Sequence, residues 1–292
     1  MKISIIGSGA MGILIAMKLN ETENNISLVA TRETAEKIER RGVVIVEGIT
    51  EIENKIKIDE EIPNADWHIL AVKNYHLDNI IPELKKYKSN ILTCQNGLKA
   101  VRKLSTELDE ERIVGMVTSV GSTVIERGHV KHTGEGYTKI GEMNGKKSER
   151  VLRIVEKFNN AGIKTEITDN LKGEIWLKGI VNSAINPVTA IASKRNGALI
   201  DGALNERARK ICEEGMRVAE KYEIEMPENP WKKTMEIITL TSDNESSMLQ
   251  DVKKGRKTEI DAINGEIARL GKNKNIETPE NDKIIEEMLV YA

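Results

Sequence analysis

Four polar residues recur at intervals of four in the mostly apolar segment Leu171–Ala192: Glu174, Lys178, Asn182 and Asn186. This interval keeps side chains on one face of an α-helix, so the four would form a stripe. A lysine can donate a proton, and an asparagine amide both donates and accepts hydrogen bonds. The stripe therefore predicts polar groups that face a cavity or a partner. A solvent-facing helix has the same spacing, although asparagine is a poor helix former.

A second polar group lies further along the chain. Asn244 or Ser246 would make a good helix N-cap. Ser247 would then lie in or beside the first turn, where its hydroxyl and free N–H groups can bind a carboxylate. The apolar spacing beyond it predicts a helix over Lys257–Leu270 that carries Glu259. Taken alone, Glu259 is better explained as an exposed helix carboxylate.

The start of the chain carries a Gly-x-Gly-x-x-Gly motif between the apolar run Ile3–Ile6 and a helical pattern. In this context Gly7 allows a tight turn, Gly9 lets the backbone approach a pyrophosphate, and Gly12 lets the helix pack close to the strand. The helix N-terminus adds free N–H groups and the positive end of its dipole. The motif predicts a dinucleotide site made by Gly7, Ser8, Gly9, Ala10, Met11 and Gly12.

The residues after the second predicted strand, Ile26–Ala30, bear on the choice between NAD and NADP. NAD sites place an acid there, on the ribose 2′-hydroxyl. Here the strand is followed by Thr31 and Arg32, and the acid Glu33 comes one position late. A guanidinium suits a 2′-phosphate because its planar fork can bond two oxygens. Arg32 is also compatible with an ordinary surface arginine, but NADP is favoured over NAD.

Composition excludes several other classes of function. The 292 residues suit one very large domain or two ordinary ones. A formal charge of −2 shows none of the basic excess that nucleic acid or an anionic membrane would require. Cys94 and Cys212 have no metal-ligand spacing and fit a reducing compartment, and no apolar run approaches the ~18–20 residues of a membrane span. We expect a soluble, cytoplasmic protein that needs no metal.

The chain shows two different patterns of apolar residues, one before and one after about residue 165. Up to about residue 165, apolar runs alternate with amphipathic stretches, which predicts a doubly wound α/β sheet. The glycine-rich segment 114–141 favours hairpins and hence an antiparallel edge. The expected strands are Ile3–Ile6, Ile26–Ala30, Val43–Glu47, Trp67–Val72, Ile91–Cys94, Val114–Ser119, Thr138–Gly141 and, as the last, Ile163–Thr168. The expected helices between them include Glu33–Arg41, Leu77–Tyr87 and Ser148–Ala161.

Long helical patterns dominate after Asp169, and Pro187 should kink or restart the first of them. The expected helices are Leu171–Ile191, Gly202–Lys221, Trp231–Thr239, Ser246–Lys254 and Lys257–Leu270. We therefore predict a Rossmann-like NADP-binding domain over residues 1–168 and an all-α substrate domain over 169–292. A cleft between two such domains is a natural place for a second ligand. The second-domain helices are compatible with a homodimer, which the sequence does not decide.

Together these motifs resemble the ketopantoate reductase (2-dehydropantoate 2-reductase) family over nearly the whole chain. The matching segments, in order, are Gly7–Gly12, Arg32, Val72-Lys73, Gln95-Asn96-Gly97, Gly128–Gly134, Lys178–Asn182, Asn186-Pro187, Asn196-Gly197, Asn244–Asp251 and Glu259–Asp261. The resemblance implies an NADPH-dependent reduction of a branched 2-keto acid, in the family ketopantoate to pantoate, on the route to pantothenate and coenzyme A.

The resemblance also implies roles for individual residues. Lys178 matches the general acid. The substrate contacts match Asn182, Asn186, Asn196 and the stretch Asn244–Ser247, and the positions near the cofactor and the cleft match Lys73, Asn96 and Glu259. This chemistry requires such groups, because hydride delivered to C2 of a keto acid builds negative charge on the carbonyl oxygen. Lys178 can stabilise and protonate that oxygen, and Glu259 would position its ammonium.

Some alternatives remain open. A different branched 2-keto acid would leave the fold and the acid–base groups unchanged, because a few contacts of ~1–3 kcal/mol each set that specificity. A regulator that binds NADP without turnover is another class. Loss of the lysine or of the cleft carboxylate would support such a regulator, and both residues are present here. A β-hydroxyacid dehydrogenase would show a different glycine-rich motif in mid-chain. For His132, a structural hydrogen bond in a hairpin explains the residue better than catalysis.

Overall fold

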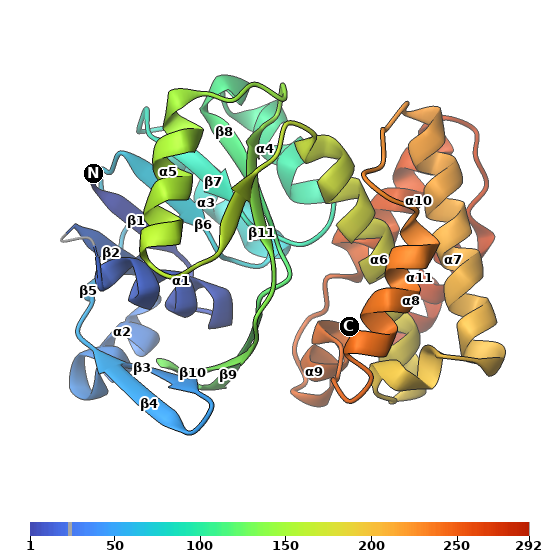
Figure 1. The fold of residues 1–292 in the computed structure, drawn as a ribbon, viewed down its shortest axis with the longest axis horizontal. Coiled ribbons are helices and arrows are strands. Elements are labelled where there is room, and N and C mark those ends of the chain that lie inside the picture. The colour runs from blue at the N-terminus through green and yellow to red at the C-terminus, as the bar shows by residue number, and fades with distance from the viewer. Residues whose placement is uncertain (23–24, 292) are drawn as a thin grey trace. The chain divides into compact units, whose positions relative to one another are not determined.

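The computed structural model describes residues 1–22 and 25–291 and is drawn in Figure 1. The chain divides into two compact units. The first contains residues 1–95 and 101–171, and the second contains residues 96–100 and 172–292. The short segment 96–100 thus leaves the first unit, packs with the second, and returns, which no pattern in the sequence indicated.

The first unit is built on an eight-stranded sheet in the order β12-β11-β8-β7-β6-β1-β2-β5. Its strands are β1 (Ile3–Ile6), β2 (Ile26–Val29), β5 (Lys57–Asp59), β6 (Trp67–Leu70), β7 (Asn90–Thr93), β8 (Ile113–Thr118), β11 (Thr138–Glu142) and β12 (Thr165–Ile167). Neighbouring strands run parallel except β8 and β11, which are antiparallel. The α/β fold and its antiparallel edge are confirmed.

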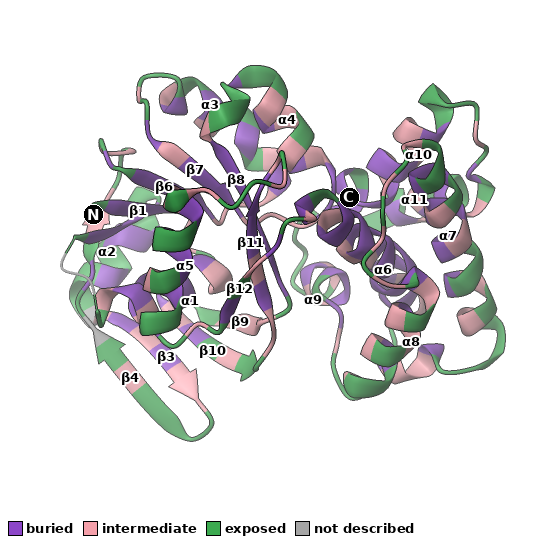
Figure 2. Ribbon diagram, turned by 45° about the horizontal axis from the view of Figure 1, so that its top comes forward, coloured by how far each residue is buried: buried purple, intermediate pink, exposed green. Residues whose placement is uncertain are grey.

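Helices cover this sheet, and its central strands are therefore buried on both faces. The helices are α1 (Ala10–Asn20), α2 (Arg32–Arg41), α3 (Leu77–Leu84), α4 (Lys99–Glu107) and α5 (Glu149–Asn160). Ile3, Ile5 and Ile69 are fully buried, in one core cluster with Ile13 of α1 and Phe158 of α5. Figure 2 shows these strands in purple. The apolar runs that predicted the strands are thus the inner layer of the unit.

A second sheet of four strands, in the order β4-β3-β10-β9, also belongs to the first unit. Its strands are β3 (Val43–Glu47), β4 (Thr50–Asn54), β9 (Gly121–Glu126) and β10 (His129–Gly134). Ile45 and Val130 pair across β3 and β10 and are buried in the same core cluster as α1. The hairpin expected within 114–141 is β9–β10. The edge strand β4, Thr-Glu-Ile-Glu-Asn, is too polar for a search based on apolar runs.

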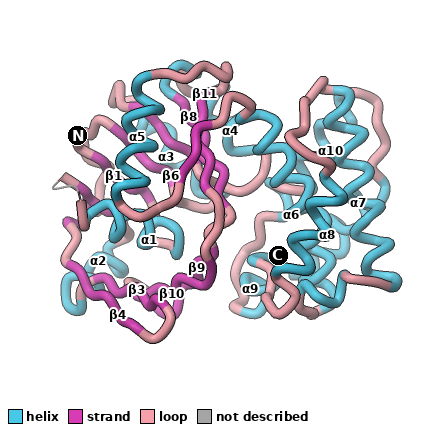
Figure 3. The backbone as a smooth tube through the Cα atoms, in the orientation of Figure 1, coloured by secondary structure: helices cyan, strands magenta, loops and turns pink. Residues whose placement is uncertain are grey.

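The second unit is helical, as predicted, and Figure 3 draws its helices in cyan. They are α6 (Leu171–Ala192), α7 (Gly202–Lys221), α8 (Pro230–Leu240), α9 (Ser247–Lys253), α10 (Asn264–Asn273) and α11 (Pro279–Met288). Ile180 and Ala184 of α6 are fully buried in a core cluster that includes Ile211, Ile267 and Ile284 of α7, α10 and α11. Because this core surrounds α6, that helix is central to the unit rather than a surface helix.

One expectation for the second unit is wrong, and one is decided in part. Pro187 does not restart the first helix, because α6 continues through it to Ala192, and a kink at Pro187 stays a prediction. The first half of the predicted helix Lys257–Leu270 is not α-helical. Glu259 instead precedes the 3₁₀ turn Ile260–Ala262 without a side-chain capping hydrogen bond, and Ile263 (φ −104°, ψ −86°) departs from helical geometry before α10 begins. The apolar spacing was misleading because Ile260 and Ile263 pack into one cluster and Ile267 into another.

Candidate functional site

Three of the predicted cofactor-binding segments begin where neighbouring parallel strands end. In the register of the sheet Ile6 of β1 lies between Val29 of β2 and Leu70 of β6. The residues that follow are the glycine motif after β1, Arg32 after β2 and Lys73 after β6. The strand order reverses at β1, and ligands of doubly wound sheets bind at the carboxyl ends of the strands at such a point.

The glycines of the motif fall into two kinds. Gly7 has φ +114°, and a Cβ there would lie 2.8 Å from Val72 Cγ1. A Cβ on Gly12 would lie 1.8 Å from the carbonyl oxygen of Gly7. The chain's own packing therefore requires glycine at both positions. At Gly9, the N-cap of α1, the nearest atom to an added Cβ is Ala71 O at 4.0 Å.

Gly9 is therefore not required by the protein itself. Its φ of −77° suits any residue, and an added Cβ would meet nothing closer than Ala71 O. A side chain at this position would occupy the space in front of the N-terminus of α1, a helix of eleven residues. A phosphate fits there, because the first N–H groups of a helix have no carbonyl partner within it. The residues of the motif fit a dinucleotide pyrophosphate.

Arg32 lies in the first turn of α2 with its side chain 79% exposed, and its Nε lies 3.2 Å from Glu36 Oε1. A second arginine, which the sequence analysis missed, reaches the same turn. Arg127, between β9 and β10, places Nη1 2.6 Å from Glu33 Oε2. The acid next to Arg32 is thus neutralised from the second sheet. No local signal could have found this pair, because it depends on how the β9–β10 hairpin packs.

The segment 96–100 brings Asn96 into the second unit. Gly97 has φ +82°, and a Cβ there would lie 2.3 Å from the carbonyl oxygen of Ala262. Leu98 packs against α6, where a Cβ on Gly179 would lie 3.6 Å from Leu98 Cγ. Gly97 neighbours Asn96, and Gly179 neighbours Lys178. The segment therefore joins the backbone beside Asn96 to the α6 turn of Lys178 and to the 3₁₀ turn that Glu259 begins.

The polar stripe on α6 is not a solvent-facing stripe. Glu174 and Asn186 are buried, and Lys178 and Asn182 are half-buried. Asn186 Nδ2 donates to Ser247 Oγ at 3.4 Å, so the stripe contacts the second polar group predicted from the sequence. Ser247 is exposed and opens α9.

Ser246 is the N-cap of α9, as anticipated, and its Oγ accepts the N–H of Leu249 at 3.2 Å. Thr189 Oγ1, on α6, donates to Ser246 Oγ at 2.7 Å. The start of α9 is therefore attached to α6 at two neighbouring serines, and this holds Ser247 beside Asn186.

Asn196 and Asn244 also lie together. The backbone N–H of Asn196 donates to Asn244 O at 3.0 Å, and Asn196 Nδ2 donates to Thr241 Oγ1 at 2.9 Å. Asn196 Oδ1 is buried and accepts no hydrogen bond from a described residue. Asn196 is 6% exposed, whereas Asn244 is exposed. An acceptor without a donor is costly to bury, so Asn196 is well suited to bind a donor group of a ligand.

Glu259 is 7% exposed, so it is not the exposed helix carboxylate that its sequence alone allowed. It is also not on a helix, as noted above. A buried carboxylate requires a positive or hydrogen-bonding partner. Its position beside the turn that contacts Gly97 places it with the α6 stripe in one part of the second unit.

Several residues are separate from this arrangement. The predicted hairpin hydrogen bond of His132 is present, with Nε2 3.1 Å from Gly134 O. Lys18 lowers the pKa of Glu47, which also lies 3.3 Å from His132 Nδ1. Burial raises the pKa of the Cys212 thiol to about 12, so Cys212 is not a nucleophile at neutral pH.

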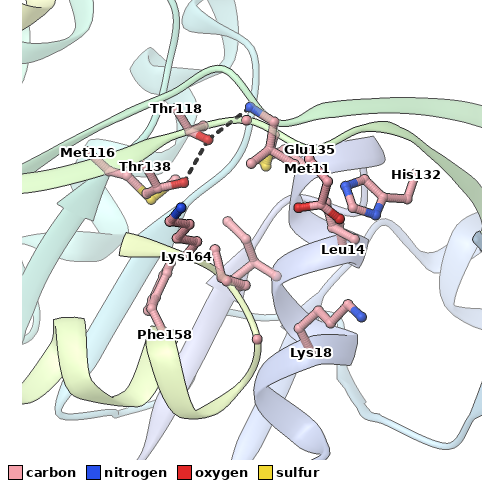
Figure 4. Close-up of a pocket in the computed structure, with 15 residues that line it drawn as sticks. Met11, Leu14, Lys18, Met116, Thr118, His132, Glu135, Thr138, Phe158 and Lys164 are labelled. Atoms are coloured by element: carbon pink, nitrogen blue, oxygen red, sulfur yellow. Dashed lines mark hydrogen bonds between the residues drawn. The ribbon is translucent and has the colours of Figure 1, made fainter. Parts of the chain in front are cut away.

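A hollow between α1 and α5 is also separate (Figure 4). Its lining includes the apolar side chains of Leu14, Met116 and Phe158 together with Lys164. Met11 alone among the predicted site residues lines it. Over residues 1–22 and 25–291, no helix is long and apolar enough to cross a membrane. In the same range, His, Cys, Asp and Glu side chains nowhere gather in threes as a metal site would require.

Comparison with protein families gives two matches that together span most of the chain. The family described as ketopantoate reductase PanE/ApbA matches residues 3–145, and its C-terminal counterpart matches residues 170–291. Among curated proteins, a 2-dehydropantoate 2-reductase of Pyrococcus horikoshii is 37% identical over 286 residues, which cover 96% of this chain and 94% of that protein.

Solved structures show the same fold. A D-mandelate dehydrogenase in a ternary complex with NADH and anilino(oxo)acetate is 25% identical with a TM-score of 0.90, over 100% of this chain and 98% of that one. A PanE/ApbA family ketopantoate reductase from Ralstonia eutropha JMP134 gives the same identity, TM-score and coverage. The two neighbours carry names with different substrates on one fold.

Proposed function

Since the chain belongs to the ketopantoate reductase family, we propose that it reduces 2-dehydropantoate to pantoate with NADPH, a step toward pantothenate and coenzyme A. The observation that carries this proposal is the contact of the segment 96–100 with the turns beside Lys178 and Glu259. It supports a single site in which Asn96, Lys178 and Glu259 act together.

In this proposal the first unit binds the cofactor. The open space at Gly9 and the N-terminus of α1 receive the pyrophosphate. Lys73, which precedes a short 3₁₀ turn after β6, lies at the same edge of the sheet and adds positive charge there. When bound, the nicotinamide supplies the hydride.

Two arginines support the choice of NADPH. The exposed guanidinium of Arg32 is available to bond a 2′-phosphate. Arg127 forms an ion pair with Glu33. Without this pair, the Glu33 carboxylate would repel that phosphate or accept a hydrogen bond from a ribose hydroxyl. A charge arrangement of this kind disfavours NADH because the acid that NAD sites need is already paired.

The second unit supplies the proton and the contacts to the keto acid. As hydride reaches C2, the C=O bond becomes C–O⁻, and Lys178 stabilises this oxygen and transfers a proton to it to form the 2-hydroxyl. The neutral amine then takes a proton from water. In this proposal Glu259, which is buried, positions the ammonium group of Lys178.

The remaining polar residues bind the substrate. Ser247 Oγ is exposed and donates to the carboxylate, and Asn186, which bonds Ser247 Oγ, orients it. Asn182 and Asn196 have the donors and acceptors to bond the hydroxyl and carbonyl groups of the substrate, with Asn244 alongside. Because α9 has only seven residues, its helix dipole is a small part of this binding.

Product analysis tests the reaction itself. NADPH deuterated at the transferred position of the nicotinamide should give pantoate with one deuterium at C2, which mass spectrometry detects. Unlabelled pantoate, or no pantoate, would contradict the proposal.

A second candidate is the reduction of a 2-keto acid with an aromatic substituent. The likeness to a D-mandelate dehydrogenase, at 25% identity over the full chain, favours it. Initial rates with phenylglyoxylate and with ketopantoate decide between the two, because the better substrate will be converted at the higher kcat/KM.

A further inference from the structure

Pro187 lies inside α6 and removes one hydrogen bond from that helix. Residue 187 has no N–H to donate to the carbonyl four residues earlier, which is that of Ser183. Ser183 is fully buried, so water cannot readily replace the missing donor. A buried carbonyl without a donor would destabilise this part of the helix.

Asn264 supplies the missing donor from α10. Its Nδ2 donates to Ser183 O at 3.1 Å and to Asn281 Oδ1 at 3.0 Å, and these two bonds use both amide hydrogens. Asn264 is fully buried, and it lies 81 residues away from Ser183 in the chain. A side chain from another helix thus takes the place of the backbone N–H that proline lacks.

A buried network holds Asn264 in this orientation. Asn281 Nδ2 donates to Glu214 Oε2 at 2.8 Å, and the backbone N–H groups of Glu280 and Asn281 donate to the same carboxylate at 2.9 Å each. Glu214, on α7, is 2% exposed. By accepting these N–H groups, its carboxylate caps the first turn of α11. Turning the amide of Asn264 would break the two bonds that link α10 to α6 and to α11.

We propose that Asn264 is a positioning residue for the turn of α6 that carries Asn182 and Asn186. Ser183 follows Asn182 directly, and Pro187 follows Asn186, so the carbonyl that Asn264 binds lies within this turn. By fixing it, Asn264 sets the direction in which the two asparagines project. The inference rests on the proposed function, in which these asparagines contact the keto acid.

A double-mutant cycle tests the inference. Asn264→Ala should lower the Tm by about 3–8 °C, because Ser183 O loses its donor. The variant should also raise the KM for ketopantoate on the order of 10-fold, because a misplaced contact weakens substrate binding. The KM for NADPH should not change. Pro187→Ala restores the backbone N–H. In that background, Asn264→Ala should therefore lower the Tm by less and change the KM for ketopantoate little.

Asn229→Ala is the matched control. It removes an Asn side chain that caps α8 in the same unit, so it should lower the Tm without changing the KM for ketopantoate. Asn264→Ala alone could fail to fold. In that case the test is the Pro187→Ala/Asn264→Ala protein, which should fold and keep a nearly unchanged KM for ketopantoate.

Two results would overturn the role of Asn264. One is an unchanged KM for ketopantoate in Asn264→Ala, and the other is an equal Tm loss in both backgrounds. A wild-type enzyme that does not reduce ketopantoate would contradict the proposed function instead, so the two failures are distinguishable.

Discussion

Gly97 lies so close to Ala262 that a Cβ on Gly97 would come within 2.3 Å of the Ala262 carbonyl oxygen. This contact ties the loop after β7 to the 3₁₀ turn that begins at Glu259. It explains why residues 96–100 pack with the second unit although the chain around them belongs to the first. In the proposed function, this contact brings the backbone beside Asn96 to the turn that begins at Glu259.

Replacing Gly97 tests this dependence. Gly97→Ala should lower kcat/KM for ketopantoate by about tenfold or more, because the loop must move away from Ala262. Gly162→Ala is the control, because Gly162 also has a positive φ but has no atom within 4 Å of an added Cβ. The control should lose some stability and keep its activity. Equal activity in the two variants would show that the contact is not needed.

Lys178→Ala should lower kcat by ~10²-fold or more, as expected for the loss of the proton donor. Lys172→Ala removes an exposed lysine from the same helix and should have little effect on kcat. Steady-state kinetics at saturating NADPH measures both. Near-normal turnover of Lys178→Ala would remove Lys178 from this role.

Arg32 and Arg127 should differ in their effects on the cofactors. Arg32→Ala should raise the KM for NADPH by about 10-fold to 100-fold and leave that for NADH nearly unchanged, since only NADPH has the 2′-phosphate. Arg127→Ala should weaken NADPH and improve NADH, because it releases Glu33. Equal losses for both cofactors would refute the 2′-phosphate assignment. Arg153→Ala, a surface arginine on α5, is the control.

Ser247→Ala should raise the KM for ketopantoate several-fold and leave NADPH affinity intact, because in the proposed function the hydroxyl contacts the keto acid and not the cofactor. Ser148→Ala is the matched control, because Ser148 caps α5 in the first unit and its loss should affect stability alone. Titration of NADPH fluorescence gives the affinity, and initial rates give KM. An unchanged KM would mean that the carboxylate binds elsewhere.

Local patterns in the sequence predicted the features that local physics controls. The strand β1 and the glycine motif could be placed because an apolar run, a tight turn and a helix start are all set within a dozen residues or so. Ser246 was identified as a possible N-cap for the same reason. The polar stripe on α6 follows from helical spacing, which tertiary contacts do not alter.

The rest depends on contacts between distant segments. Arg127 reaches Glu33 only because the β9–β10 hairpin packs beside β3. Glu259 leaves the expected helix because Ile263 breaks it so that two apolar clusters can form. Asn264 replaces the donor that Pro187 lacks, from 81 residues away. Spacing along the chain carries no signal for any of these.

The most direct test of the central claim is the initial rate of NADPH oxidation with ketopantoate, beside NADH and a panel of simpler and aromatic 2-keto acids. We predict the highest kcat/KM for the pair NADPH and ketopantoate. Comparable rates with NADH would contradict the role of Arg32, and a higher kcat/KM for another keto acid would contradict the proposed substrate. Tight NADPH binding without turnover of any acid would contradict the assignment as a reductase.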